Sequence, residues 1–391
     1  MNAYIIKGYR TAVGRAKKGG FRFTRPDDLA VETIKHLVSS IEGLENEMVD
    51  DVIVGNAVQE AEQGMQMGRM ISLMALGIET PGMVINRYCG SGLEAIHLAS
   101  AKINAGMADV VIAGGTESMS MVPVMGYKTA LNYKIASEHP DYYTSMGLTA
   151  EQIAQEWKIS RDEQDQFAYN SHMKAVAAQK DGKFKDEILP ITVKETYVEN
   201  GKKKNREYVV DTDEGPRADT SVEVLGKLRP VFAAGGSVTA GNSSPTNDGA
   251  AFVVVMSEKK VKELGLEPVA RMVSYAVAGV EPRIMGVGPT YAVPKALDRA
   301  GLKLNDIDLI ELNEAFAAQS ISVIRDLDMD MSKVNVNGGA IALGHPLGST
   351  GARLSITLLN EMRRRQGSKY GMVTACVGGG QGVAGIYEFL K

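Results

Sequence analysis

The stretch that decides the fold is MVINRYCGSGLEAIHLASAKINA, residues 83–105. It opens with a short apolar run, residues 83–87, which predicts a buried strand. A turn with two glycines follows, and residues 92–105 then have the composition of a helix. Cys89 lies in that turn. A strand that passes through a glycine-rich turn into a helix is typical of layered α/β folds.

The residues before and after this stretch continue the alternation. Apolar runs at 3–8, 51–55 and 110–114 predict three more strands, and residues 26–41 and 64–76 predict helices between them. Apolar strands separated by helices indicate an α/β fold whose sheet is covered on its faces.

The last third of the chain repeats this plan. Residues 307–312, 333–337 and 370–375 predict strands, and a second glycine-rich turn holds His345. Ile53 precedes Cys89 by 36 residues, and Ile310 precedes His345 by 35. These spacings predict two copies of one structural unit, whose turns converge if the copies pack face to face.

The middle of the chain, about 119–249, has a different character. Residues 149–157 and 161–179 predict helices, and Ser160 with Glu163 forms an N-terminal capping pattern for the second. The polar residues 195–206 predict a solvated hairpin or loop. We interpret this region as an insertion into the first half.

Charge and composition limit the partners. The 391 residues carry a formal net charge of −4, so no general basic excess indicates nucleic acid as a ligand. No run approaches the ~20 apolar residues of a membrane span, and we see no signal peptide. The expected location is the cytoplasm.

The chain has only two cysteines, Cys89 and Cys376. A disulfide framework is therefore excluded, and the five histidines show no metal-ligand spacing with them. Each cysteine is either an inert core residue or a reactive thiol. At Cys89 the start of a helix offers unpaired N–H groups and a positive dipole, which favour the reactive thiolate.

Three other polar residues lie at similar places. His345 lies in a glycine-rich loop, Cys376 follows a predicted strand and precedes a run of glycines, and Asn313 follows another strand. Taken singly, each has an ordinary structural explanation: a histidine bonded to loop carbonyls, a core thiol, a helix cap. Taken together, in two duplicated halves, they predict one catalytic site.

Four segments carry a specific resemblance to the thiolase family, and the match runs along nearly the whole chain. They are NRYCGSGL (86–93), NEAFA (313–317), GHPLG (344–348) and CVGGGQG (376–382), in the family's order. The resemblance implies a duplicated α/β thiolase fold with two five-stranded mixed sheets in an α-β-α-β-α arrangement, plus an inserted loop domain. It implies a first half at 1–118 and 250–266, a CoA-binding loop domain at 119–249, and a second half at 267–391.

The resemblance also implies residue roles. Cys89 is similar to the nucleophile that accepts the acyl group, and Cys376 to the acid/base that exchanges a proton with the acetyl-CoA α-carbon. His345 polarises the thioester oxygen and assists Cys89, with a water held by Asn313. The backbone N–H groups of Cys89 and Gly378 form a second oxyanion site.

Coenzyme A is expected as a co-substrate, with no bound cofactor and no metal. The family match places Arg217 at the CoA phosphates and adenine. The other expected binding residues line the pantetheine tunnel (Leu228, Phe232, Ala240 and Ser244) or lie nearer the acyl group (Met146, Met285, Ala315 and Phe316).

Departures from the family pattern favour one branch. Ser145 and Val224 replace residues of acetyl-specific biosynthetic members, and Tyr88 resembles the degradative branch. We therefore expect a 3-ketoacyl-CoA thiolase of fatty-acid β-oxidation, acting on acyl-CoA and CoA. The alternatives are an acetyl-CoA acetyltransferase and a non-catalytic CoA- or lipid-binding protein. A homodimer or homotetramer is expected, and a β-oxidation enzyme is a possible partner.

Overall fold

The computed structural model describes residues 2–390. The first half of the chain forms five strands of a mixed sheet. In spatial order they are β4 (Gly82–Ile85), β3 (Asp51–Gly55), β5 (Val110–Ser118), β9 (Asn247–Ser257) and β1 (Ala3–Thr11). β3 runs parallel to β4 and β5, whereas β9 runs antiparallel to β5 and β1. The short strands β2 (Gly14–Arg15) and β6 (Ile188–Leu189) pair with β9 and β1.

The second half repeats this order. Its strands are β11 (Leu309–Leu312), β12 (Tyr370–Val377), β13 (Gln381–Phe389) and β10 (Ala270–Gly279). β11 is parallel to β12, and β13 is antiparallel to β12 and β10, which are the relations of β3, β5, β9 and β1. The predicted duplication is therefore present in the topology.

The expectation of two five-stranded sheets is wrong in two details. In the second half the strand expected at 333–337 is reduced to a single parallel bridge, Ile310 to Val334. Asn335 ends it, because its φ is +44° and its side-chain amide bonds the backbone N and O of Leu312 at 2.9 Å each. The two sheets are also continuous, because β1 and β10 pair antiparallel at Ile5 and Ala270.

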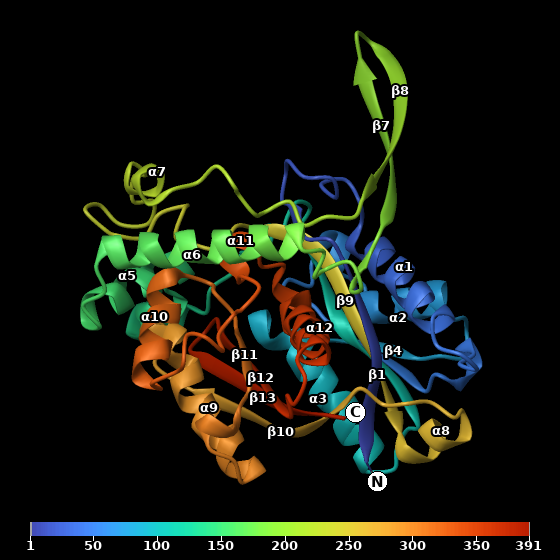
Figure 1. The fold of residues 1–391 in the computed structure, drawn as a ribbon. Coiled ribbons are helices and arrows are strands. Elements are labelled where there is room, and N and C mark those ends of the chain that lie inside the picture. Colours follow the sequence, from blue (N-terminus) through green and yellow to red (C-terminus); the bar gives the residue numbers. More distant parts are fainter. Residues whose placement is uncertain (1, 391) are drawn as a thin grey trace.

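Helices fill three layers around the two parts of the sheet (Figure 1). α3 (Ser91–Asn104) and α12 (Leu347–Arg364) lie between them and are buried on both sides. α1 (Pro26–Ser39) and α2 (Met67–Ala75) cover the outer face of the first half. α9 (Gly288–Ala300) and α10 (Ala317–Asp326) cover that of the second. The α-β-α-β-α arrangement predicted from the sequence is confirmed.

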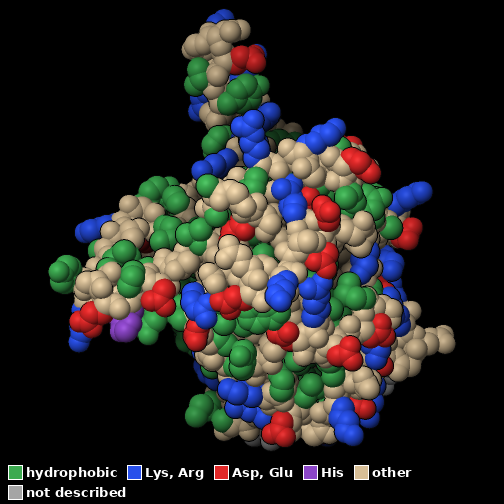
Figure 2. All heavy atoms as spheres, turned by 90° about the vertical axis from the view of Figure 1, so that its left-hand side faces the viewer, with side chains coloured by type: hydrophobic (Ala, Val, Ile, Leu, Met, Phe, Trp, Pro, Cys, Tyr) green, Lys and Arg blue, Asp and Glu red, His purple; other side chains and the backbone are tan. Residues whose placement is uncertain are grey.

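The segment between β5 and β9 lies over the edge where the central helices begin. Its helices are α4 (Tyr133–Glu138), α5 (Met146–Glu156), α6 (Arg161–Lys180) and α7 (Val222–Gly226). Ser160 caps α6 through the predicted capping box with Glu163. The polar stretch forms a hairpin of β7 (Ile191–Glu199) and β8 (Lys202–Val210), which projects from the body (Figures 1 and 2).

The remaining helical elements are short. They include α8 (Glu258–Glu263), which follows β9, and α11 (Ala340–Leu343), which precedes the His345 loop. The 3₁₀ turns are η1 (Asn46–Met48), η2 (Ala61–Gln63), η3 (Tyr88–Gly90), η4 (Pro140–Tyr143), η5 (Pro282–Val287) and η6 (Leu304–Asp306). Among residues 2–390 no helix is long and apolar enough to cross a membrane.

Candidate active site

The turn that carries Cys89 is fixed by local polar groups. Tyr88 has a φ of +42°, a left-handed conformation that is costly for a bulky side chain. Its backbone N–H donates to Oδ1 of Asn86 at 2.8 Å. The hydroxyl of Ser91 accepts from the N–H of Arg87 at 2.9 Å and donates to the Tyr88 carbonyl at 2.7 Å. These bonds hold Cys89 just before the first turn of α3.

Glycines allow the two central helices to begin side by side. Cys89 stands two residues before α3, and His345 stands two residues before α12. A Cβ atom on Gly348 would lie 2.6 Å from the carbonyl oxygen of Gly55, and one on Gly351 would overlap the backbone nitrogen of Leu93. Bare backbone at this crossing therefore brings the two reactive turns together.

Cys89 is a thiol at rest. Its side chain is buried, with 8% of the residue exposed. Burial raises the pKa of Cys89 to about 12, and the carboxylate of Glu117 adds to the shift, whereas the backbone N–H groups of Gly378 and Cys89 bond the sulfur and lower the pKa. The thiolate expected from the helix N-terminus is thus not the resting state, because desolvation outweighs the dipole. A base must remove the proton.

The hairpin between β12 and β13 directs the backbone N–H of Gly378 towards Cys89. Val377 and Gln381 pair across it, and Gly379 and Gly380 make the turn with φ values of +78° and +83°. These two glycines absorb the left-handed conformation. The N–H of Gly378 is left to bond the sulfur of Cys89.

Cys376 lies near Cys89 and is fully buried. Burial raises the pKa of Cys376 well above its usual value, and the proximity of Cys89 raises it further. The side chains packed around it include the four residues expected near the acyl group; the cluster consists of Met146, Ala150, Val238, Met285, Ala315 and Phe316. Cys376 therefore lies among apolar side chains, and Cys89 packs in a second apolar cluster with Ala57, Met119 and Leu347.

His345 is held at both ring nitrogens. Nδ1 lies 2.7 Å from Oγ1 of Thr350, and Nε2 lies 3.3 Å from Nδ2 of Asn313. Burial, together with the charge of Arg353, lowers the pKa of His345 to about 3. The imidazole is neutral near pH 7, so it is able to accept a proton.

Asn313 follows β11 and joins His345 to β12, the strand that carries Cys376. Its backbone N–H donates to the carbonyl of Thr374 at 2.9 Å. Its Oδ1 is buried and has no hydrogen-bond partner among the described residues. A buried amide oxygen without a partner is costly, and a water in the site would satisfy it.

Four expected CoA-binding residues lie at the outer side of this cluster. Leu228, Phe232 and Ala240 are exposed, and Ser244 is half-buried. The ring of Phe232 meets that of Phe316 edge to face, with centroids 6.0 Å apart. The N–H of Ser244 donates to the carbonyl of Ala315 at 2.9 Å. These contacts join the exposed residues to the cluster around Cys376.

Arg217 lies apart from them, beside His172. Its backbone N–H donates to Nδ1 of His172 at 3.2 Å, and its side chain is exposed. Burial, together with the charges of Arg217 and Arg15, lowers the pKa of His172 to about 4. Two guanidinium groups and the carboxyl group of Asp219 therefore lie near His172, and no hydrogen bond or ion pair among the described residues joins Arg217 to Leu228 or Phe232.

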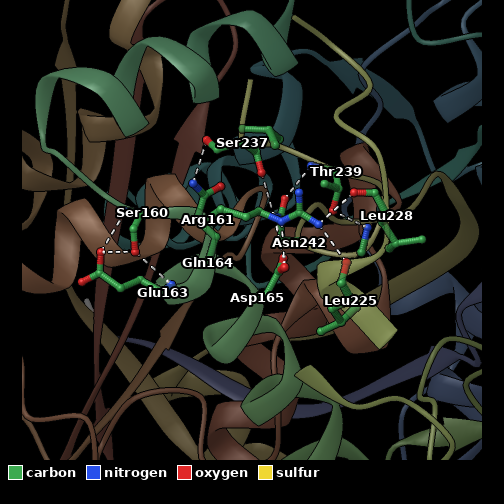
Figure 3. Close-up of polar contacts among 12 residues, drawn as sticks. Ser160, Arg161, Glu163, Gln164, Asp165, Leu225, Leu228, Ser237, Thr239 and Asn242 are labelled. Atoms are coloured by element: carbon green, nitrogen blue, oxygen red, sulfur yellow. Dashed lines mark hydrogen bonds and ion pairs between the residues drawn. The ribbon is translucent and has the colours of Figure 1, made fainter. Parts of the chain in front are cut away.

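A buried carboxylate holds the segments that carry Leu228 and Ala240 (Figure 3). Asp165 accepts from Nε of Arg161 at 2.7 Å and from Nδ2 of Asn242 at 2.9 Å. Arg161 donates to the carbonyls of Leu225 and Leu228 at 2.8 and 2.9 Å. The amide oxygen of Asn242 accepts from the Thr239 N–H at 2.8 Å. Both loops are thus anchored on the first turns of α6.

Comparison with known proteins assigns the family. Residues 3–259 match the model of the thiolase N-terminal domain, and residues 266–389 match that of the thiolase C-terminal domain. The chain belongs to the thiolase family. Its division between the two family domains falls where the duplication of the fold places it, between β9 and β10.

Relatives within the thiolase family match the chain from end to end. A 3-ketoacyl-CoA thiolase of Bacillus subtilis is 51% identical over 388 residues, covering 99% of each chain. An acetyl-CoA acetyltransferase of Pseudomonas aeruginosa is 47% identical, covering 97% of each. The crystal structure of a Bacillus anthracis acetyl-CoA acetyltransferase superposes with a TM-score of 0.89 at 41% identity, covering 100% of this chain and 99% of that one.

Sequence reasoning missed two residues of this thiolase site. Glu117, at the end of β5, accepts from the N–H groups of Ala57 and Gly348 at 2.8 and 2.9 Å, so it ties the first half to the start of α12. Asn247 accepts from the His345 N–H at 2.9 Å. The position of Glu117 at a strand's carboxyl end was a usable signal; nothing local distinguishes Asn247.

The described part of the chain holds no group of side chains that could bind a metal ion. Within residues 2–390 there is no cluster of three or more His, Cys, Asp or Glu side chains that could hold a metal ion. The polar groups of the candidate site are the backbone N–H groups that bond the Cys89 sulfur, the carboxyl group of Glu117 near it, and the imidazole of His345 bonded to the carboxamide of Asn313. The arrangement suits acyl transfer between thiols and the stabilisation of oxyanions.

Proposed function

We propose that the protein cleaves 3-ketoacyl-CoA with CoA, giving acetyl-CoA and an acyl-CoA shortened by two carbons. The observation that carries this proposal is the pair of neighbouring buried thiols, Cys89 and Cys376, with a neutral His345 on Asn313. A nucleophile and a separate acid/base are the groups that this reaction needs.

In the first half-reaction Cys89 attacks the 3-keto carbon. His345 takes the thiol proton at Nε2 as the sulfur–carbon bond forms, since the thiol is protonated at rest. The new oxyanion accepts from the N–H groups of Cys89 and Gly378. The bond between C2 and C3 then breaks, and its electron pair leaves as the enolate of acetyl-CoA.

The enolate is protonated at C2 by the thiol of Cys376, which gives acetyl-CoA and a Cys376 thiolate. While the enolate forms, its oxygen accepts from the protonated His345 and from a water on Asn313, whose Oδ1 is free to hold it. Removing one such donor typically costs about 10²–10³ in rate.

The second half-reaction returns the enzyme to its starting state. The Cys376 thiolate takes the proton of the CoA thiol, and the CoA sulfur attacks the acyl-Cys89 thioester. The same two N–H groups bind the oxyanion. Cys89 leaves as a thiolate and recovers its proton from His345, and the shortened acyl-CoA is released.

The CoA-binding part of the proposal rests on the inserted segment, residues 119–249. Leu228, Phe232, Ala240 and Ser244 border the cluster around Cys376, which suits the pantetheine arm. The guanidinium groups of Arg217 and Arg15, which lie near His172, suit the phosphates of CoA. We keep the division into two thiolase halves and this CoA-binding loop domain as part of the proposal, with CoA as co-substrate and no bound cofactor.

The alternative activity is that of an acetyl-CoA acetyltransferase, which forms acetoacetyl-CoA from two acetyl-CoA. Relatives with both names match the whole chain, at 51% and 47% identity. Tyr88 beside the nucleophile and Ser145 before α5 favour the degradative branch. A non-catalytic CoA- or lipid-binding role is disfavoured because both thiols, His345 and Asn313 are all present.

A homodimer is part of the proposal, with a homotetramer as the alternative. β4 ends the sheet in the described part of the chain, and exposed apolar residues lie on the adjacent α2 and its flanks: Met65, Met70, Met74 and Ile78. An unpaired edge strand beside exposed apolar side chains is typical of a surface that another chain covers. Light scattering after gel filtration measures the mass of the assembly and so the number of chains in it. A cytoplasmic location and association with another β-oxidation enzyme also remain proposals.

The deciding experiment is CoA-dependent cleavage of acetoacetyl-CoA against longer 3-ketoacyl-CoAs, with Cys89→Ala as the control. Faster cleavage of the longer substrates, lost in the variant, is the expected result. Activity confined to acetoacetyl-CoA would assign the acetyltransferase reaction instead. If the protein binds CoA but cleaves none of these substrates, the non-catalytic CoA- or lipid-binding role is the remaining interpretation.

A further inference from the structure

Thr350 is a buried hydroxyl that the reaction scheme above leaves unused. It lies in the first turn of α12 and is fully buried. Its Oγ1 makes two short contacts, one of 2.8 Å to the carbonyl oxygen of Pro346 and one of 2.7 Å to Nδ1 of His345. Both partners are fixed, Pro346 by the turn and His345 by the bond of its N–H to Asn247.

The single proton of this hydroxyl decides the protonation of the ring. A carbonyl oxygen can only accept, so the Thr350 hydroxyl donates to Pro346. Toward His345 the same oxygen therefore accepts, and Nδ1 must carry a proton. Because the ring is neutral, Nε2 then has a free lone pair. The Nδ2 of Asn313, a donor 3.3 Å from Nε2, agrees with this tautomer.

We propose that Thr350 is a positioning residue that holds His345 in the Nδ1-protonated tautomer, so that Nε2 is ready to take the proton of Cys89. This inference rests on the proposed function, which makes His345 the base. Without the hydroxyl, a neutral histidine can place its proton on either nitrogen. The Nε2-protonated form cannot accept the thiol proton, and the burial of Cys89 leaves no thiolate to replace that step.

Two substitutions separate the hydroxyl from the shape of the side chain. Thr350→Val keeps the branched shape and removes the hydroxyl, whereas Thr350→Ser keeps the hydroxyl and removes a methyl group. We expect Thr350→Val to lower kcat for thiolysis by about 10-fold or more, within the 10²–10⁴ that a general base contributes. KM for CoA should stay the same. Thr350→Ser should retain most of the wild-type kcat.

Two readouts do not depend on the identity of the substrate. The rate at which iodoacetamide alkylates Cys89, followed by mass spectrometry, should fall in Thr350→Val and recover in Thr350→Ser. The ¹⁵N shifts of labelled histidine should show a protonated Nδ1 in the wild-type ring and a mixture in Thr350→Val, with His345→Asn identifying the signal among the five histidines.

The outcomes distinguish this inference from the proposed function. A wild-type protein without thiolysis would remove the proposed function, while alkylation and ¹⁵N shifts would still test Thr350. A Thr350→Val variant with wild-type kcat and alkylation would overturn the inference. So would a Thr350→Ser variant as impaired as Thr350→Val, because packing rather than the hydroxyl would then be the cause.

Discussion

A Cβ atom on Gly92 of α3 would lie 2.8 Å from the backbone nitrogen of Ala352 in α12. The two central helices therefore cross backbone to backbone, immediately behind the turns that hold Cys89 and His345. Backbone atoms cannot move aside as the end of a flexible side chain can, so any side chain at this position must push the helices apart.

Gly92→Ala is expected to lower both stability and activity. Overpacking of this kind typically costs about 1–3 kcal/mol in the free energy of unfolding, and separation of the helices would move the two reactive turns apart. Urea denaturation and thiolysis assays measure the two effects. Gly279→Ala is the matched control, because a Cβ there meets nothing within 4 Å. Equal behaviour of the two variants would contradict the role of this crossing.

Cys376→Ala should separate the two thiols by function. Because Cys376 is proposed as the acid and base, its loss should lower kcat by about 10²–10⁴. Cys89 should still react with iodoacetamide, since His345 and the N–H groups remain. In Cys89→Ala, by contrast, no acyl-enzyme can form. Mass spectrometry after incubation with 3-ketoacyl-CoA distinguishes them, and an acyl adduct on Cys376 in Cys89→Ala would reverse the assigned roles.

Asp165→Asn should weaken CoA binding more than it slows the chemistry. The substitution removes the charge that holds Arg161 and places an amide where an acceptor is needed, so the loops with Leu228 and Ala240 lose their common anchor. A hydrogen bond to a charged group contributes about 1.5–3 kcal/mol, which corresponds to about a 10-fold or larger rise in KM for CoA. Steady-state kinetics with varied CoA measures this change.

The control for that experiment is Asp162→Asn, an exposed acid on the same helix. It should leave KM for CoA unchanged. A fall in kcat with an unchanged KM in Asp165→Asn would mean that the network serves the reactive turns rather than the CoA loops.

Glu311 should make the fold less stable as pH rises. Burial raises the pKa of Glu311 from 4.5 to about 8, against the opposing charge of Arg353. The folded state binds the proton of Glu311 more tightly than the unfolded state does. Binding of this proton therefore contributes fully to the free energy of unfolding below pH 4.5. That contribution is lost as pH rises through 8.

The test for Glu311 compares wild-type protein with Glu311→Gln by urea denaturation at about pH 5.5 and pH 9. The wild-type free energy of unfolding should fall more steeply over this interval than that of the variant. Glu267→Gln, at an exposed acid, should follow the wild type. If the free energy of unfolding changes with pH equally in the wild type and in Glu311→Gln, then Glu311 stays in one protonation state over this interval.

Local patterns predicted the elements and the reactive turns. The strand, glycine turn and helix around Cys89, and the glycine turn and helix around His345, are visible in the sequence because each arises from residues close together in the chain. The capping box of Ser160 is equally local. The pairing of the two halves could be inferred only from the repeat in spacing.

Properties that arise from packing were harder to predict. The resting thiol of Cys89 results from burial by both halves, which a sequence position near a helix start does not reveal. The loss of a strand at Val334 depends on one left-handed residue, Asn335, whose side chain takes over the backbone bonds of Leu312. Glu117 bonds partners that are 60 and 231 residues away in the sequence, and Asn247 bonds one that is 98 residues away.

The duplicated topology divides the chemistry between the two copies. Each copy has a turn directly before its central helix. One turn holds Cys89 and the other holds His345, each two residues ahead of the helix. A fragment with only one copy therefore holds a nucleophile without its base, or a base without its nucleophile. Two separately expressed fragments, divided between β9 and β10, would be inert alone and would recover activity only by reassembly, so turnover itself would report that the halves had found each other.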